Sequence, residues 1–469
     1  MEYFATSFNP SGNRFVDVCG TLPKANPRRL SYSYESVSSK INWIVGTSNG
    51  IEFVTVSRDG TQQRLNFDGE GSNATFSPTD SSDRPLLASG TPLEPIIPPS
   101  NASITGQAVP TPDGGYLFVS NEQRFTQVSP TGEDVTSNEL DSIIDPLLDG
   151  HITYSSTNQL WALFNRNTDD RYVHAIMGDD QEGYELHVLK WSDEHNIVEI
   201  ETSMLLPGDD MVFEQLAPMW ADINGDGIDD ILVTTSTSGS GAQLLAYILG
   251  RNETTGKFQV TDTTSSPYIG TGNRWLHQLA VGPLGPHGET EVVEIRTPHI
   301  GGIVRYYRLQ TGGDNSTVGN LSLVAETSQY STHDIGSRNI DMATVADFDG
   351  DGIPELVVAD QQSNFLYGLQ RSDDGKVDEV WKVPLGRTAR RFLSSNIAVS
   401  CNKNDGSDRI ELLMGLESTE ILRVSFTTDK LDAKGGPTFY ETVNSGSSVG
   451  GANFLASLWI FFTIWRISF

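Results

Sequence analysis

The sequence predicts an all-β protein built from repeated hairpins, and three observations support this. Short runs rich in β-branched and aromatic residues alternate with turns of Gly, Asn, Asp and Pro, as in 41–46, the turn at 48–50 and 51–56. No amphipathic helical pattern of about twelve residues or more is present. Two acidic, glycine-containing loops are each followed by an apolar β-branched run. Strands joined by turns are therefore expected from end to end.

The two acidic loops, 222–230 and 347–355, have the composition of cation sites. Each carries oxygen-bearing side chains at loop positions 1, 3, 5 and 9 and glycine at positions 4 and 6. Hard cations such as calcium take about six to eight oxygen ligands, and alternate residues of a tight loop can turn their oxygens toward one point. An EF-hand would need a bidentate glutamate at position 12 and flanking helices, but Val233 and Val358 stand there. The loops are therefore predicted to be cation loops inside β-hairpins.

The unit that contains these loops recurs along the second half of the chain. Residues 280–293 and 398–413 keep the flanking apolar runs and the final acid, Glu291 or Glu411, but lose the early acids. The steps between copies are 60, 65 and 53 residues, measured along Asp222, Gly282, Asp347 and Ser400. Repeats of about 40–65 residues with roughly four short strands each are typical of β-propeller blades. We therefore predict a single β-propeller.

The repeat length also gives a blade count and domain boundaries. About 440 residues precede the C-terminal tail, and at roughly 60–65 residues each they give seven four-stranded blades. Six or eight blades also fit, because the N-terminal blades are poorly delimited. We predict a propeller over 1–440, clearest over 216–423, then a Ser/Gly linker over 441–453 and a short hydrophobic tail over 454–469.

The loop motif resembles a known repeat family. Asp-x-(Asp/Asn)-Gly-Asp-Gly-x-x-(Asp/Glu) between β-runs is similar to the FG-GAP/VCBS repeats of integrin α-subunit propellers, propeller lectins and secreted bacterial and algal proteins. The strings 267–276 and 296–301 are also similar to a group of uncharacterised secreted VCBS-repeat proteins. The resemblance covers roughly 216–423 and is strong for two blades.

This resemblance implies calcium binding with a structural role. The implied side-chain ligands are Asp222, Asn224, Asp226 and Asp230 in the first loop and Asp347, Asp349, Asp351 and Glu355 in the second, and the carbonyls of Ile228 and Ile353 complete each site. The alternative, an acid-rich turn without an ion, would leave several carboxylates repelling one another. An affinity in the extracellular range, micromolar to millimolar, is expected.

The acidic composition of the chain limits the classes of binding partner that it is expected to have. The net charge of −30 and the pI near 4.5 argue against nucleic acid and against anionic membrane surfaces. They favour metal cations or neutral and basic partners, although the acidity can equally serve solubility alone. A monomer is expected. Five Asn-X-Ser/Thr triplets permit a secreted glycoprotein without demonstrating one: Asn73, Asn101, Asn252, Asn315 and Asn320.

The termini and the two cysteines leave alternatives open. No signal peptide is visible at the N-terminus. The order of small residues, polar spacer and apolar tail over 445–469 is that of a GPI-attachment signal, whereas a truncated membrane span or a mistaken gene end would also give it. Cys19 and Cys401 lie near opposite ends of the globular part, so a circular fold could bring them together as one disulfide or leave two unrelated thiols.

A ligand site is harder to place. The chain lacks the His-Glu-x-x-His and Gly-x-Ser-x-Gly motifs and a phosphate-binding glycine loop. His299 and His333 each stand beside an Ile-Gly turn and, with Arg274, Trp275 and Arg305, could line a central pocket; the alternative is repeated turn and packing residues. Five tryptophans are expected in the core between blades rather than on sugar platforms: Trp43, Trp161, Trp191, Trp220 and Trp381.

Two functions fit these observations. The first is a calcium-stabilised propeller, extracellular or at the cell surface and anchored through its tail in one interpretation, that binds a glycan or protein without catalysis. The second is a secreted propeller enzyme, a lyase or hydrolase acting on carbohydrate, with histidine and acidic residues on the axis. Binding sites repeated at the blade crevices would favour the first, and one asymmetric cluster of His, Arg and carboxylate would favour the second.

Overall fold

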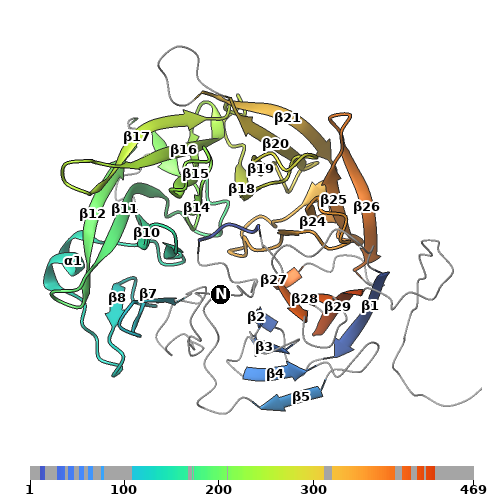
Figure 1. Ribbon diagram of the computed structural model, residues 1–469, viewed down its shortest axis with the longest axis horizontal. Coiled ribbons are helices and arrows are strands. Elements are labelled where there is room, and N and C mark those ends of the chain that lie inside the picture. The colour runs from blue at the N-terminus through green and yellow to red at the C-terminus, as the bar shows by residue number, and fades with distance from the viewer. Residues whose placement is uncertain are drawn as a thin grey trace, which may run out of the picture.

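The computed structural model shows a ring of antiparallel sheets around a central axis, which confirms the all-β propeller prediction (Figure 1). The structure describes residues 11–15, 29–36, 41–46, 52–57, 62–66, 75–78, 108–166, 172, 174–206, 208, 210–310, 319–385, 393–402, 409–416 and 419–427. Cys19 and the 454–469 tail fall outside these residues. Among the described residues, no helix has the length and apolarity to cross a membrane.

The first three strand groups come from the N-terminal half. One sheet is formed by β2 (Ile41–Gly46), β3 (Glu52–Ser57), β4 (Gln62–Asn66) and β5 (Thr75–Pro78). A three-stranded sheet follows, made of β6 (Val109–Pro110), β7 (Tyr116–Val119) and β8 (Phe125–Val128), with the short helix α1 (Asn138–Ile143) after it. The third group is β9 (Thr153–Ser155), β10 (Leu160–Arg166), β11 (Gly183–Ser192) and β12 (Ile197–Leu205).

The fourth group shares a sheet with the third. It contains β13 (Met211–Phe213), β14 (Met219–Ala221), β15 (Asp230–Thr237), β16 (Gly241–Arg251) and β17 (Phe258–Ser265). A single pairing of Gly183 with Phe213 connects the two groups into nine strands. The described strands thus form six sheets, one of which holds two meanders, and the number of blades stays a prediction.

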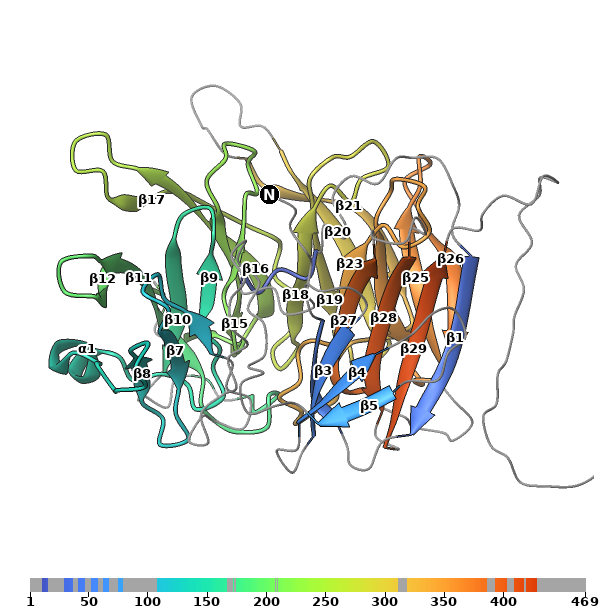
Figure 2. The same ribbon diagram turned by 60° about the horizontal axis from the view of Figure 1, so that its bottom comes forward.

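The remaining strands complete the ring. The next sheet is β18 (Leu276–Gly282), β19 (Glu291–Arg296), β20 (Ile303–Leu309) and β21 (Leu321–Ser328). It is followed by β22 (Tyr330–Ser331), β23 (Thr344–Ala346), β24 (Glu355–Asp360), β25 (Phe365–Arg371) and β26 (Val377–Pro384). The last sheet combines β27 (Leu393–Asn402), β28 (Arg409–Leu416) and β29 (Glu420–Thr427) with β1 (Arg29–Ser36), which lies beside β29 in Figure 2.

The core lies between neighbouring sheets. Middle strands such as β15 are buried along their whole length, because the sheets on either side cover both faces of each sheet. Phe348 of the loop between β23 and β24 and Trp381 of β26 each lie with a ring-centroid distance of 5.2 Å to Phe426 of β29 in the following sheet. Trp161, Trp220 and Trp381 are buried as expected, whereas Trp191 is only partly buried.

The antiparallel order separates two faces of the ring. Loops 222–229 and 347–354 connect β14 to β15 and β23 to β24 at one face, which we call the acid-loop face. Segment 297–302 connects β19 to β20 and segment 332–343 connects β22 to β23, both at the opposite ends of the strands, which we call the histidine face. Short segment 11–15 lies near the centre of the ring (Figure 1), where Phe15 forms a parallel bridge with Val345 of β23.

Candidate functional sites

The second acidic loop gathers its four acids. One ligand oxygen from each of Asp347, Asp349, Asp351 and Glu355 lies within 4.8 Å of the others. Backbone N–H groups hold the carboxylates in place, since Gly350 and Gly352 donate to the two oxygens of Asp347 at 2.7 and 3.1 Å. Gly352 has a φ of +93°, a left-handed conformation that glycine adopts at little cost. The turn therefore depends on glycine and points its oxygens inward.

Glu355 is the least satisfied member of this cluster. Its side chain is fully buried, and Oε2 accepts the backbone N–H of Phe348 at 2.7 Å. Oε1 is buried without a hydrogen-bond partner among the described residues. Burial raises the pKa of Glu355 well above its usual range, and the charge of Asp349 raises it further. A buried carboxylate oxygen without a donor is costly, so either a proton or a cation at this atom would lower its energy.

The two repeat copies that lack the early acids, 280–293 and 398–413, show how the final acid is satisfied when no cation loop is present; we call them the worn repeats. Glu291 and Glu411 occupy the same repeat position and are also fully buried. Oε1 of Glu291 accepts from Arg308 at 2.7 Å, and Oε1 of Glu411 accepts from Arg423 at 2.9 Å. No described Arg or Lys pairs with Glu355 in this way. The second loop therefore lacks a positive charge that the worn copies supply from a neighbouring strand, and its all-oxygen donor set fits calcium.

The Gln370 side chain on β25 hydrogen-bonds to two residues of the second loop. Its amide donates to Oδ2 of Asp351 at 2.9 Å and to the carbonyl of Ile353 at 3.1 Å. Both acceptors are among the implied ligands, so an arriving cation would compete with this amide for them. The N–H of Ile353 donates to Oδ1 of Asp351 at 2.8 Å, which is a turn contact rather than a ligand contact.

The first loop has the same turn but a different arrangement of acids. Asp222 accepts from the N–H groups of Gly225 and Gly227 at 2.7 and 2.9 Å, as Asp347 does in the second loop. Asp230, however, accepts two backbone N–H groups, from Ile223 at 3.0 Å and Leu249 at 2.9 Å. Burial raises the pKa of Asp230 to about 7. Both of its oxygens are thus occupied.

The other implied ligands of the first loop contact one another. The side-chain amide of Asn224 donates to Oδ2 of Asp226 at 3.0 Å, and the N–H of Ile228 donates to Oδ1 of Asp226 at 2.8 Å. In the described part of the chain, the three implied aspartate ligands of this loop, Asp222, Asp226 and Asp230, do not meet within 4.8 Å as the second set does. The two predicted loops are therefore unequal as cation sites.

Three of the five predicted ligand-binding residues meet at the histidine face. The Trp275 ring stacks on His299 at 5.8 Å and lies 4.8 Å from His333, measured between centroids. Nδ1 of His299 lies 3.2 Å from the carbonyl of His333, whereas Nε2 of His299 is buried without a hydrogen-bond partner among the described residues. Arg274 and Arg305 do not join them. Arg274 is exposed, and Arg305 pairs with Glu326 at 2.9 Å.

A second group at this face was not anticipated from the sequence. Nδ1 of His174 lies 2.6 Å from Oε1 of the buried Glu214, and Ser236 donates to the other oxygen. The indole N–H of Trp275 donates to the Glu214 carbonyl at 2.8 Å, which connects this pair to the predicted cluster. Glu182 lies close by, and its pKa is raised well above its usual value by burial and then by the charge of Glu214.

The segment 11–15 fills the axial side of several strands. Arg14 donates to the carbonyls of Gln278 and Leu279 at 3.0 and 3.2 Å, and to that of Ile340 at 2.6 Å. The side chain of Asn13 accepts the N–H of Val281 and donates to its carbonyl. This segment therefore occupies part of the axis where a central pocket was expected.

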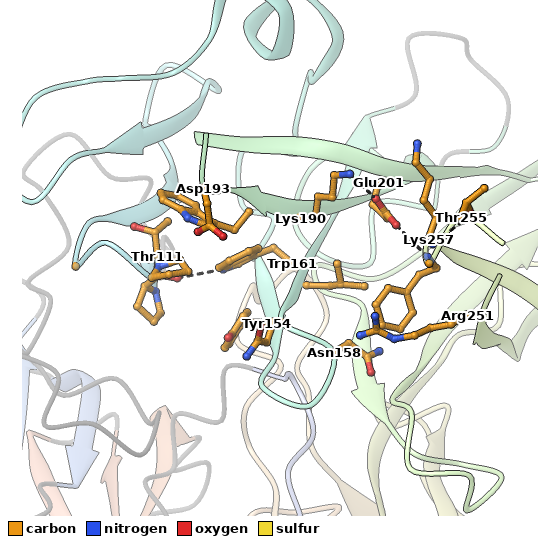
Figure 3. Close-up of a pocket in the computed structure, with 18 residues that line it drawn as sticks. Thr111, Tyr154, Asn158, Trp161, Lys190, Asp193, Glu201, Arg251, Thr255 and Lys257 are labelled. Carbon is orange, nitrogen blue, oxygen red and sulfur yellow. Dashed lines mark hydrogen bonds and ion pairs between the residues drawn. The ribbon is translucent and has the colours of Figure 1, made fainter. Parts of the chain in front are cut away.

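A cavity of 610 Å³ opens on the acid-loop face between the β9–β12 and β14–β17 meanders (Figure 3). Its walls include the aromatic residues Tyr154, Trp161, Trp191 and Phe258, and the charged residues Lys190, Asp193, Glu201, Arg251 and Lys257. The turn that carries Asn158 joins this cavity to the first acidic loop, because the Asn158 amide donates to the Asp229 carbonyl at 2.7 Å. The sequence did not predict this cavity, because Trp161 and Trp191 were expected in the core between blades.

Comparison with known proteins gives likeness of fold only. No protein-family model matches the chain, and no curated protein matches it. The β-propeller domain of Cps50 (Swd1) from Myceliophteria thermophila is 10% identical, with a TM-score of 0.39 over 85% of this chain and 99% of that one. Sqt1 of Saccharomyces cerevisiae is 11% identical, with a TM-score of 0.39 over 85% and 99%. A hypothetical selenium-binding protein from Sulfolobus tokodaii is 11% identical, with a TM-score of 0.38 over 82% and 90%. We infer no ligand or partner from these likenesses.

Proposed function

We propose that the protein is a calcium-binding β-propeller of the FG-GAP/VCBS type that serves as an extracellular or cell-surface binding module for a glycan or a protein. The observation that carries the calcium assignment is Glu355, which clusters with three further carboxylates and whose buried Oε1 has no donor among the described residues. Asp347, Asp349, Asp351 and Glu355 would hold the ion. Its charge would take the place of the arginines that satisfy Glu291 and Glu411.

Calcium acts here as a part of the fold. The loop 347–355 joins β23 to β24, so an ion there fixes the inner hairpin of a blade. A ligand that binds only the native state stabilises it by about 2.7 kcal/mol at one hundred times its Kd. The proposed extracellular location is compatible with the micromolar to millimolar affinity expected of such loops, which suits calcium concentrations outside cells.

The experiment is a thermal and calorimetric titration with calcium and with EDTA. Calcium should raise the Tm of the wild-type protein, and Glu355→Gln should remove most of this response. The matched control is Glu411→Gln, which changes the same repeat position in a copy that has its own arginine; it should lower the Tm but keep the calcium response. An unchanged melting curve in EDTA, with no calcium found by elemental analysis, would overturn the assignment.

Binding of a glycan is supported by the cavity on the acid-loop face. Its volume falls within the roughly 300–1,000 Å³ of small-molecule sites, and partly exposed Tyr154 and Trp191 lie in its wall. A glycan-array screen with and without EDTA tests this part of the proposal. Binding that falls when EDTA unfolds or loosens the ring is the expected result; no glycan bound by the folded, calcium-loaded protein would contradict it.

An enzyme is the second candidate, and the His174–Glu214 pair favours it. A buried carboxylate that orients one ring nitrogen of a histidine prepares the other nitrogen to take up a proton. Glu182, whose pKa is raised, could supply a proton nearby. Release of reducing ends or of unsaturated products from a polysaccharide panel would support this role if His174→Gln abolished it and the exposed His287→Gln did not. No turnover of any polysaccharide would count against it.

A further inference from the structure

The cavity on the acid-loop face collects positive charge in a strongly acidic protein. The chain has 61 acidic and 31 basic residues, so most described cations lie within 4.0 Å of an acid. Among residues whose side chains the structure describes, four have no such partner: Arg251, Arg274, Lys257 and Lys382. Two of the four, Arg251 and Lys257, line this one cavity. Their positive charges are therefore available to a ligand, because no described acid forms an ion pair with them.

The turn that presents these two cations is fixed in position. Oε1 of Glu201 on β12 accepts the backbone N–H of Phe258 at 2.9 Å, and Oε2 of Glu201 pairs with Lys190 at 3.1 Å. Of the two acids that line the cavity, Glu201 and Asp193, Glu201 is therefore already paired. The guanidinium of Arg251 lies over the Phe258 ring, 4.2 Å from its centroid, and Figure 3 shows it directed toward Asn158 and the cavity.

The opposite wall is aromatic. Tyr154 is partly exposed and rests on the fully buried Trp161, with 4.8 Å between the ring centroids. Trp191 is partly exposed as well, while Trp161 donates its indole N–H to the Pro110 carbonyl at 3.2 Å. Tyr154 and Trp191 can therefore face a ligand, whereas Trp161 supports them from below. Aromatic faces suit the apolar face of a pyranose ring, and a guanidinium suits a carboxylate or sulfate.

We propose that this cavity binds an acidic saccharide, with the sugar ring against Tyr154 or Trp191 and its carboxylate or sulfate on Arg251 and Lys257. This rests on the glycan-binding function proposed above and assigns its ligand class. The net charge of −30 repels long polyanions such as nucleic acids. A short ligand with one localised negative charge and many hydroxyl groups meets both the cationic and the aromatic wall.

The test is isothermal titration of the full, calcium-loaded chain with a short, otherwise neutral oligosaccharide that carries one galacturonate residue, and with the same oligosaccharide after reduction of that carboxyl group. The acidic form should bind, and the reduced form should bind about tenfold more weakly or worse. Arg251→Gln should weaken binding of the acidic form by roughly tenfold or more, and Trp191→Ala should weaken both forms. The same neutral oligosaccharide with a single sulfate ester in place of the carboxylate distinguishes sulfate from carboxylate as the preferred anion.

The matched control is Lys382→Gln. Lys382 also lies over an aromatic ring, that of Phe365 at 5.1 Å, but outside the cavity, so this change should leave binding unaltered. Equal binding of the acidic and reduced forms, or an Arg251→Gln protein that is folded and binds normally, would overturn the proposal while glycan binding itself stood. A glutamate oligopeptide that binds as well as the saccharide would overturn the ligand class. No saccharide bound at all would contradict the glycan-binding function too.

Discussion

The guanidinium of Arg371 on β25 lies with Nε 3.0 Å from Oε2 of Glu291 on β19, so a buried ion pair joins two neighbouring sheets. Arg308 binds the other oxygen of Glu291 from within the same sheet. A buried acid held by two cations is stable only while every partner remains, because an uncompensated buried charge is expensive. This worn repeat has thus kept its final acid, Glu291, whose negative charge is balanced by Arg308 and Arg371.

Removing the acid from this pair should destabilise the ring. Glu291→Gln leaves Arg371 buried without its counter-charge, and we expect a loss of about 3 kcal/mol or more in the free energy of unfolding. Urea denaturation of the purified protein measures it. The control is Glu289→Gln, which removes a more exposed partner of Arg308 and should cost much less. Equal losses in the free energy of unfolding for both variants would show that the buried pair between the sheets contributes no more to stability than the exposed one.

The two acidic loops should fill with calcium in a fixed order. The 347–355 loop gathers four carboxylates, whereas in the first loop Asn224 replaces one acid and Asp230 has both oxygens engaged. Calorimetric titration of the metal-free protein should show two phases. Asp351→Asn should remove the tighter phase and Asp226→Asn the weaker one. The reverse assignment would mean that the gathered carboxylates do not determine affinity.

The buried histidines should make stability fall in acid. Burial lowers the pKa of His333 from 6.5 to about 3. Between these values the unfolded chain binds a proton that the folded one does not, so the free energy of unfolding decreases as pH falls, by up to about 1.4 kcal/mol per pH unit. His333→Asn should flatten this part of the profile relative to the wild type. Parallel profiles from urea unfolding across this range would contradict the assignment.

Arg14 should be required for the axial contacts. Its guanidinium satisfies three buried backbone carbonyls and pairs with Asp341, so Arg14→Gln should cost roughly 3 kcal/mol. Arg124→Gln removes a surface pair with Asp141, whose side chains are 47% and 42% exposed, and should cost less than about 1 kcal/mol. Denaturant unfolding of the two variants compares them directly. A small loss at Arg14 would indicate that the segment 11–15 is dispensable.

Spacing in the sequence predicted the hairpins, the propeller and the repeated final acid of each unit. It could not predict how each acid is satisfied, because Arg308 and Arg423 reach Glu291 and Glu411 through strand register. Nor did it separate the two loops. Asp230 accepts two backbone N–H groups and the longer Glu355 accepts one, a difference that the repeat pattern does not contain.

The sites formed by distant segments were beyond the sequence pattern. His174 and Glu214 are 40 residues apart in the chain and belong to no repeat. The cavity joins turns from three strand groups, and Trp191, expected in the core, is a partly exposed residue of its wall. Within the predicted pocket set, Trp275, His299 and His333 come together, but Arg274 and Arg305 lie apart from them.

The pairing of β1 with β29 has a consequence for synthesis. Arg29 pairs with Thr427, so one of the first strands to leave the ribosome must wait for nearly the last before its own hydrogen bonds can form. Until then β1 presents an open edge, the kind of surface that recruits other chains into aggregates. The nascent chain therefore needs either protection of the β1 edge or a delay in the folding of β1 into a strand. Slow translation near the end of the chain would prolong the time for which this edge is exposed.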